Sequence, residues 1–202
     1  MTRVTSPFDW IGTTGLILLL IAAACAAMLA GHRLRELERG FPSGLVRSGV
    51  VLLAAPWSHE RAEALYRQLR AESSEDDPGS WTKALRQHTY IDFWFAAAVT
   101  ILLATICSAL SRGLDGIEPR IASIVALVAW GVLAAFVFDS LENIGILWML
   151  DGATSSPFPQ LTTIASALKW TAYAGGMMAV LAGSLKLTLH VVSTVVNRVA
   201  GQ

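Results

Sequence analysis

Charged residues are scarce in this sequence of 202 residues. Asp, Glu, Lys and Arg together make up 15% of the chain, and hydrophobic residues make up 54%. Soluble domains usually contain about 25% charged residues. A deficit of this size indicates that lipid, rather than water, surrounds much of the chain.

Cysteine is nearly absent, and there is no excess of charge of either sign. Cys25 and Cys107 lie far apart in apolar runs, so we expect packing residues and no cofactor. The 15 basic and 15 acidic residues cancel, which gives no reason to expect a nucleic-acid partner. The sequence also lacks G-x-S-x-G, P-loop, H-E-x-x-H and paired C-x-x-C motifs. Hydrolase, nucleotide-binding and zinc-finger functions therefore have no motif support.

Long apolar runs, by contrast, recur four times. They cover residues 10–31, 90–111, 121–150 and 161–185, and each reaches the roughly 20 residues that a helix needs to cross a bilayer. The charged stretch HRLRELER follows the first run, which is typical of an uncleaved membrane helix rather than a signal peptide. The sequence therefore predicts an all-α integral membrane bundle of four transmembrane helices, with residues 1–202 forming a single membrane domain.

A polar region, residues 32–88, separates the first two runs. The spacing of its apolar residues predicts an amphipathic helix over 58–72. A shorter helix over 44–55 would lie at the membrane interface, since twelve residues are too few to span, and the composition of 73–79 predicts a linker. The region holds nine of the fifteen Lys and Arg residues. The positive-inside rule therefore predicts a plasma (inner) membrane protein with a cytoplasmic 32–88 loop and external termini.

Several polar side chains interrupt the apolar runs. The second run contains Asp92, the third contains Asp139, Glu142 and Asn143, and the fourth contains Lys169. Under the predicted topology, all five lie at a similar depth in the cytoplasmic half of the membrane. Because an unpaired charge is costly there, we expect the helices to bring these residues together, with Lys169 neutralising Asp139 or Glu142.

Small residues are expected to guide the packing of the third and fourth spans. Two sets recur every four positions: Gly131, Ala135, Asp139 and Asn143 in one, and Thr171, Gly175, Ala179 and Gly183 in the other. Residues four apart lie on the same side of a helix, and small ones allow close approach. We therefore expect Gly131 to face the bundle interior with the polar pair, and Gly175 to lie at a helix crossing.

The candidate ligand-binding residues are the polar cluster and two neighbouring tryptophans: Asp92, Asp139, Glu142, Asn143, Lys169, Trp94 and Trp170. His88 lies four residues before Asp92, on the same side of the helix. Together with the acids it could form a mixed metal site. We favour the simpler expectation that His88 is solvated at the membrane interface, and we predict no metal.

Two resemblances rest on these residues. An acid near the start of one span, followed by D-x-x-E-N (Asp139 to Asn143) in the next, resembles uncharacterised bacterial four-span membrane proteins and implies no particular activity. The pattern H-x-x-x-D-x-W-F from His88, followed by a mid-membrane Glu142, is similar to the sterol isomerase (emopamil-binding) family, which has Glu where this chain has Asp92. This second resemblance implies a membrane-embedded isomerase or lipid-modifying enzyme, with His88, Asp92 and Glu142 as catalytic candidates.

Three functions stay open at this point. The cluster could hold helices together or dock another membrane subunit, it could bind a lipophilic small molecule with or without chemistry, or it could relay protons or cations. The external half of the second span offers few polar residues, namely Thr100, Thr105 and Ser108. That scarcity favours a one-sided pocket over a continuous ion path. The expected partners are membrane lipids, a lipophilic small molecule, and a second copy or another membrane subunit.

Overall fold

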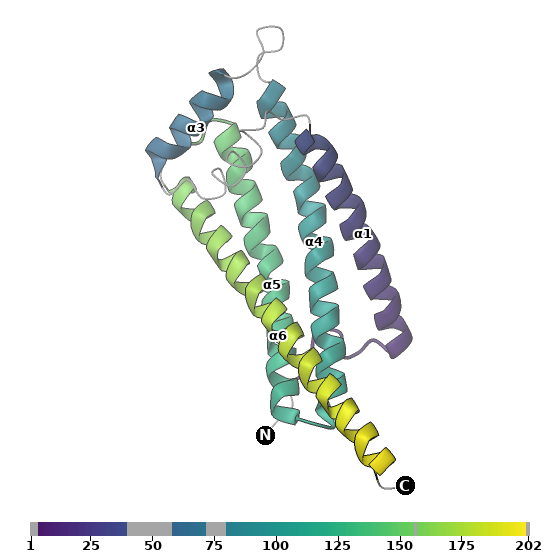
Figure 1. Cartoon of the computed structure of the whole chain (residues 1–202). Coiled ribbons are helices and arrows are strands. Elements are labelled where there is room, and N and C mark those ends of the chain that lie inside the picture. The colour runs from purple at the N-terminus through teal and green to yellow at the C-terminus, as the bar shows by residue number, and fades with distance from the viewer. Residues whose placement is uncertain (1–3, 40–57, 72–79, 156, 201–202) are drawn as a thin grey trace. The chain divides into compact units, whose positions relative to one another are not determined.

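The regular secondary structure of the protein is α-helical throughout the part of the chain that the computed structural model describes, residues 4–39, 58–71, 80–155 and 157–200. In chain order the helices are α1 (Thr13–Arg39), α3 (His59–Ala71), α4 (Ser80–Asp115), α5 (Pro119–Leu150) and α6 (Phe158–Ala200) (Figure 1). Four of them, α1, α4, α5 and α6, are long and apolar enough to cross a membrane. The predicted all-α fold, with four helices able to span a membrane, is confirmed.

Three helices extend well beyond the predicted spans, and α4 does so by beginning at Ser80. α1 continues through its charged stretch to Arg39, because Leu, Arg and Glu are good helix formers even outside an apolar run. α6 continues to Ala200, since neither Gly nor Pro interrupts residues 184–200. α3 matches the amphipathic helix predicted over 58–72. The predicted helix over 44–55 and linker over 73–79 lie outside the described residues.

The chain forms two compact units, each built from parts of several helices. The first contains Met1–Ala23, Thr100–Ala135 and Thr171–Gln202, and the second contains Ala24–Val99 and Phe136–Trp170. In the first unit, small and aliphatic side chains of α4 and α5 form the core: Leu103, Ala104, Cys107, Leu114, Ala122, Val125, Ala129 and Val132. The candidate site residues predicted from the sequence belong to the second unit.

Gly176, rather than Gly175, brings α6 close to its neighbours in the first unit. A Cβ atom on Gly176 would lie 2.6 Å from Val132 and 2.7 Å from Leu103, so a larger residue would force these side chains to move. Gly175 is exposed, and its Cβ position meets no described atom within 4 Å. The expectation for Gly175 was therefore wrong, because steps of four residues drift around a helix by about 40° each.

Two further expectations about small residues also need correction. Gly131 is exposed, with no described atom within 4 Å of its Cβ position, so it does not face a bundle interior. It lies eight residues before Asp139 and has drifted by about 80° from that residue's side of α5. Ala135 is fully buried, as expected. Both cysteines were expected to be packing residues. Cys107 is buried, as expected, but Cys25 is exposed, so the expectation was wrong for Cys25.

Candidate functional site: a buried polar network

Lys169 connects α5 and α6 in the second unit. Its Nζ atom lies 3.0 Å from Oδ1 of Asp139 and 2.7 Å from Oε2 of Glu142. The predicted pairing of Lys169 with one acid or the other is confirmed, and the lysine pairs with both. This pairing is possible because Asp139 and Glu142, three residues apart on α5, face the same side.

Asn143 connects α5 to α4. Its Nδ2 atom donates to Oδ2 of Asp92 over 3.2 Å and to Oδ2 of Asp139 over 3.0 Å. One amide group thus uses both of its hydrogens to bridge two carboxylates. The predicted cluster therefore exists as a chain of contacts through three helices, and we call it the polar network: Asp92, Asn143, Asp139, Lys169 and Glu142.

The polar network is closed to solvent over most of its length. Asp139, Glu142, Asn143 and Lys169 expose 7% or less of their surface, and Asp92 is half-buried. Three carboxylates face one ammonium, so the network has a formal charge of −2 when all groups are ionised. Buried ion pairs require good geometry and further hydrogen bonds to offset the loss of water. Oε2 of Glu142, despite its ionic partner, accepts no hydrogen bond of good geometry from the described residues.

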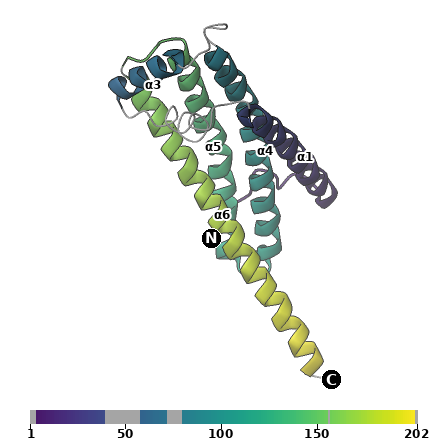
Figure 2. The ribbon, with the colours of Figure 1, turned by 45° about the horizontal axis from the view of Figure 1, so that its top comes forward.

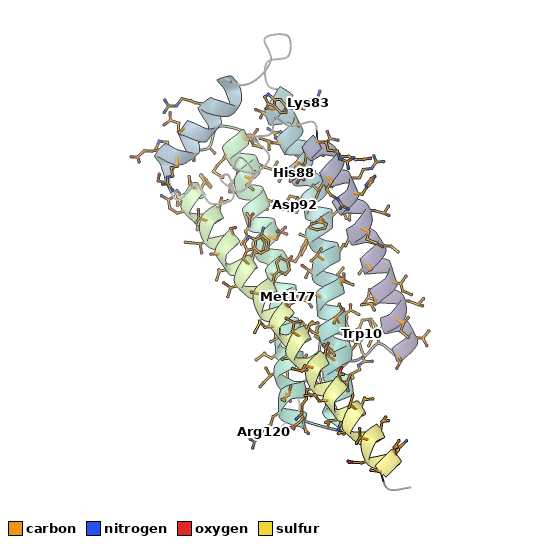
Figure 3. All side chains as sticks on the ribbon, in the orientation of Figure 1. Trp10, Lys83, His88, Asp92, Arg120 and Met177 are labelled. Carbon is orange, nitrogen blue, oxygen red and sulfur yellow. The ribbon has the colours of Figure 1, made fainter. Side chains whose placement is uncertain are left out.

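His88 contacts Glu38 of α1. It exposes only 6% of its surface, and its Nε2 atom lies 3.3 Å from Oε1 of Glu38, near the end of α1. The expectation that His88 is solvated was wrong, because α1 continues past the predicted span and brings Glu38 to α4. Figure 3 shows His88 and Asp92 one turn apart on α4. Among the described residues, no group of three or more His, Cys, Asp or Glu side chains is placed to hold a metal ion.

The two candidate tryptophans point outward. Trp94 exposes 76% of its surface and Trp170 exposes 64%, so both lie where lipid would surround the helices. Trp94 follows Asp92 by two residues, which turns it by about 200° around α4. Trp170 keeps one contact with the polar network, because Nζ of Lys169 lies 5.4 Å from its ring centroid, within cation–π range.

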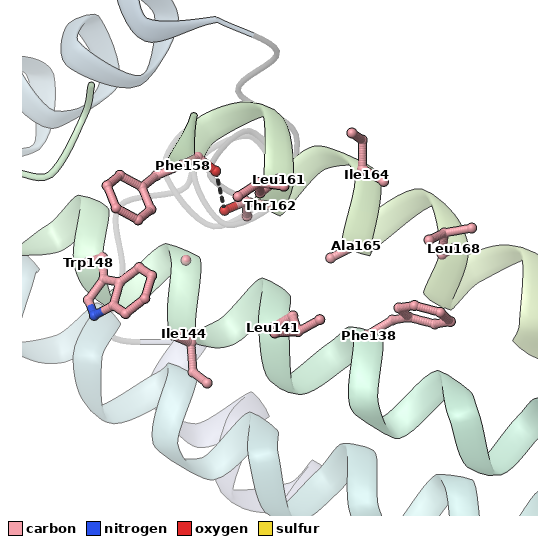
Figure 4. A pocket seen from close by; sticks show the side chains of 11 residues that line it. Phe138, Leu141, Ile144, Trp148, Phe158, Leu161, Thr162, Ile164, Ala165 and Leu168 are labelled. Carbon is pink, nitrogen blue, oxygen red and sulfur yellow. Dashed lines mark hydrogen bonds between the residues drawn. The ribbon is translucent and has the colours of Figure 1, made fainter. Parts of the chain in front are cut away.

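A groove runs between α5 and α6 in the second unit (Figure 4). Its volume is about 360 Å³, and its lining includes Phe138, Leu141, Trp148, Leu161 and Leu168. Leu141 and Leu168 directly neighbour Glu142 and Lys169 in the sequence, yet no described residue that lines the groove belongs to the polar network. The ligand site expected at the acids and the apolar groove are thus separate features of the same helix pair.

The two walls of the groove approach each other closely near its end. A Cβ atom on Gly145 would collide with Oγ1 of Thr162, so glycine is needed for α6 to lie this near. The rings of Trp148 and Phe158 meet edge to face, with their centroids 5.0 Å apart. The hydroxyl of Thr162 donates to the carbonyl oxygen of Phe158 over 2.9 Å, so the polar group of this residue is already satisfied.

Polar contacts lie beyond this end of the groove, in the connection between α5 and α6. Arg86 of α4 forms an ion pair with Asp151, and its hydrogen bond holds the pKa of that carboxyl below the usual range. His59 of α3 hydrogen-bonds the carbonyl oxygen of Thr154. Gly152 has a φ of 94°, a left-handed conformation that favours glycine and allows the chain to turn from α5 towards α6.

Sequence reasoning missed Gly145, Thr162 and Glu38. Gly145 had a detectable signal, since it interrupts an apolar run two residues after Asn143.

Comparison with known protein families, curated proteins and solved structures finds no match for this chain.

Proposed function

We propose that this multi-pass membrane protein binds a lipophilic molecule, most simply the acyl chain of a membrane lipid, in the groove between α5 and α6. The observation that carries the proposal is an apolar groove of about 360 Å³ on two helices long enough to span a membrane. Small-molecule sites commonly measure about 300–1,000 Å³. Because the hydroxyl of Thr162 bonds within its own helix, the lining favours a hydrocarbon ligand.

The length and ends of the groove support a single chain within one leaflet. From Phe138 to Trp148, α5 rises by roughly 15 Å, about half the thickness of a bilayer's hydrocarbon core. Trp148 lies at the end beside the polar contacts of Asp151, and tryptophan favours the membrane–water interface. The acyl chain would therefore lie along the groove, with its headgroup beyond Trp148.

In this proposal the polar network fixes the walls of the groove and does not contact the ligand. Lys169 holds α6 against Asp139 and Glu142, while the preceding residue, Leu168, lines the groove. A buried ion pair is favourable only over a narrow range of distances and orientations, so the pairs formed by Lys169 restrict how α6 lies against α5. The structural role and the lipophilic-ligand role expected from the sequence are thus combined in one helix pair.

A proton or cation relay is the second candidate function, favoured by the surplus of carboxylates in the polar network. It would need a continuous row of polar groups through the membrane. In the first unit, however, Thr105 and Ser108 of α4 donate their hydroxyl hydrogens to carbonyl oxygens of their own helix. Because these hydroxyl groups are bonded within their own helix, they support a continuous row of polar groups poorly. The polar network is therefore better explained as a closed structural network than as part of a relay.

A sterol-type isomerase is the alternative that comes from the resemblance. It would require His88, Asp92 and Glu142 to surround one ligand. His88 contacts Glu38, whereas Glu142 contacts Lys169, so each of the two already has another side chain as its partner. The geometry therefore supports lipid binding better than acid–base chemistry on a sterol.

We also propose that the protein lies in the plasma (inner) membrane, with the 32–88 loop in the cytoplasm and both termini outside. The support is the concentration of Lys and Arg in that loop. The groove would then open to the cytoplasmic leaflet, because its Trp148 end lies on the same side as the loop.

A bulky substitution in the groove tests the proposed function. Leu141 is 53% exposed and lines the groove, so Leu141→Trp should fill it without disturbing buried residues. Leu127 on the same helix is 62% exposed and supplies the matched control, Leu127→Trp. With a photoactivatable fatty acid in membrane vesicles, we expect several-fold less labelling of α5 and α6 in Leu141→Trp than in the control. Equal labelling of the two variants would overturn lipid binding in the groove.

A further inference from the structure

The last part of α6 carries an apolar stripe that no described residue of the first unit covers. Its members are spaced alternately three and four residues apart, and all are exposed: Ala182, Leu185, Leu189, Val192, Val196 and Val199. We call this set the α6 stripe. The alternation of three and four is the spacing of the buried seam in a coiled coil.

The α6 stripe lies opposite the face that packs within the first unit. On the packed face, a Cβ atom on Gly183 would lie 3.5 Å from both Leu110 and Leu114 of α4. Leu185 follows Gly183 by two residues, which turns it by about 200° around the helix. Leu185 is accordingly 61% exposed. The stripe is therefore free to meet another helix without displacing α4 or α5.

Part of the α6 stripe lies beyond the point where α4 ends and α5 begins. Nζ of Lys186 lies 2.8 Å from Oε1 of Glu118, which stands in the connection between those two helices. From there, residues 187–200 continue as helix for about 21 Å. Figures 1 and 2 both show this end of α6 projecting past the connection. Val192, Val196 and Val199 belong to the projecting part.

The projecting part is amphipathic, which argues against lipid as its cover. Val191 and Val195 are also exposed and lie beside the stripe, so they widen the apolar side, whereas His190, Ser193, Thr194 and Asn197 lie on the other side of the helix. A helix surrounded by lipid is apolar on all sides, whereas a helix with one apolar stripe packs against another element. Since the charged pair of Lys186 and Glu118 is partly exposed, it fits the membrane–water interface, and Val192, Val196 and Val199 then lie outside the hydrocarbon core.

We propose that the α6 stripe is the contact between two copies of this chain, whose α6 helices pair in parallel as a short coiled coil. Copies in one membrane share the same orientation, so the stripe of one meets the same stripe of the other in register, as a two-fold interface requires. Gly175, seven residues before Ala182, continues the spacing into the membrane. Its open Cβ position allows two helices to approach closely there.

Cysteine cross-linking in membrane vesicles tests the pairing. Val192→Cys and Val199→Cys place a thiol on the stripe, and His190→Cys places one on the other side of the same helical segment. Each is made with Cys25→Ala, because Cys25 is exposed, while Cys107 is buried and can stay. Under oxidation we expect a product of twice the chain's mass, several-fold more abundant for the two stripe positions than for His190→Cys.

Three outcomes would overturn the proposal. Equal yields at all positions would indicate random collision, and no product at any position would leave the stripe uncovered or facing lipid. Products of another mass would indicate a different protein partner.

A second pair of variants tests the dimer without oxidation. Leu189→Lys should abolish the dimer in mild detergent, and His190→Lys should preserve it. Both positions are exposed, so both variants should keep the wild-type Tm of the monomer. A dimer that survives Leu189→Lys would also contradict the pairing.

Discussion

Nζ of Lys169 lies 2.7 Å from Oε2 of Glu142, so a base in α6 neutralises an acid in α5 within the second unit. The same ammonium lies 3.0 Å from Asp139. All three side chains are buried, which means that water cannot replace a missing partner. The stability of the helix pair should therefore depend on the balance of charges more than on any single residue.

Replacing Lys169 by Met should destabilise the protein strongly. Breaking a buried pair from one side costs about 3–5 kcal/mol, because it leaves uncompensated charge. Adding Glu142→Gln should recover part of the loss, and adding Asp139→Asn as well should recover more. The free energy of unfolding in detergent measures each variant. If the single effects simply add in the double variants, the residues do not interact, and the pairing is contradicted.

Substituting alanine for Gly145 should destabilise the α5–α6 pair. The new methyl group would collide with Thr162, and overpacking of this kind typically costs about 1–3 kcal/mol. Gly131→Ala is the matched control, since its Cβ position is open, and alanine should stabilise the helix there by up to about 1 kcal/mol. Thermal unfolding in detergent compares the two. The proposed contact would be refuted by a Gly145→Ala variant as stable as Gly131→Ala.

The proposed topology can be tested by labelling single cysteines in intact cells. With Cys25→Ala, a cysteine at Gly116 should react with a membrane-impermeant maleimide from outside. A cysteine at Ser74 should react only after the cells are permeabilised, because the 32–88 loop carries most of the basic residues. The opposite pattern would reverse the orientation and place the groove in the external leaflet.

The sequence predicted the membrane helices and the polar network well, for physical reasons. Apolar runs of sufficient length specify spanning helices, and the cost of buried charge required a partner for Asp139 and Glu142. Lys169 was the base at the same predicted depth. Its contact with both acids, however, depends on how close α6 comes to α5, and that distance is set by Gly145 and Thr162.

The packing glycines show where a repeat of four residues fails. Gly131 and Gly175 fitted such repeats but are exposed, because each step of four turns the side chain by about 40°. Gly176 and Gly183, seven residues apart, drift by only about 20° and stay on one face.

The position of His88 was predicted wrongly for another reason. α1 extends to Glu38 through a region whose composition predicts a polar loop, and this extension brings Glu38 to His88.

The arrangement of acids on α5 and the base on α6 also has a consequence for biosynthesis. When the ribosome has completed α5, the nascent chain carries Asp139 and Glu142 in an apolar segment, and Lys169 has not yet been made. On scales from translocon insertion, each charge in a membrane helix costs up to about 2.5–3.5 kcal/mol, the full value being reached at the helix centre. The turn at Gly152 connects the two helices directly, so α6 can follow at once and supply the counter-charge. We therefore expect α5 and α6 to enter the bilayer as one hairpin.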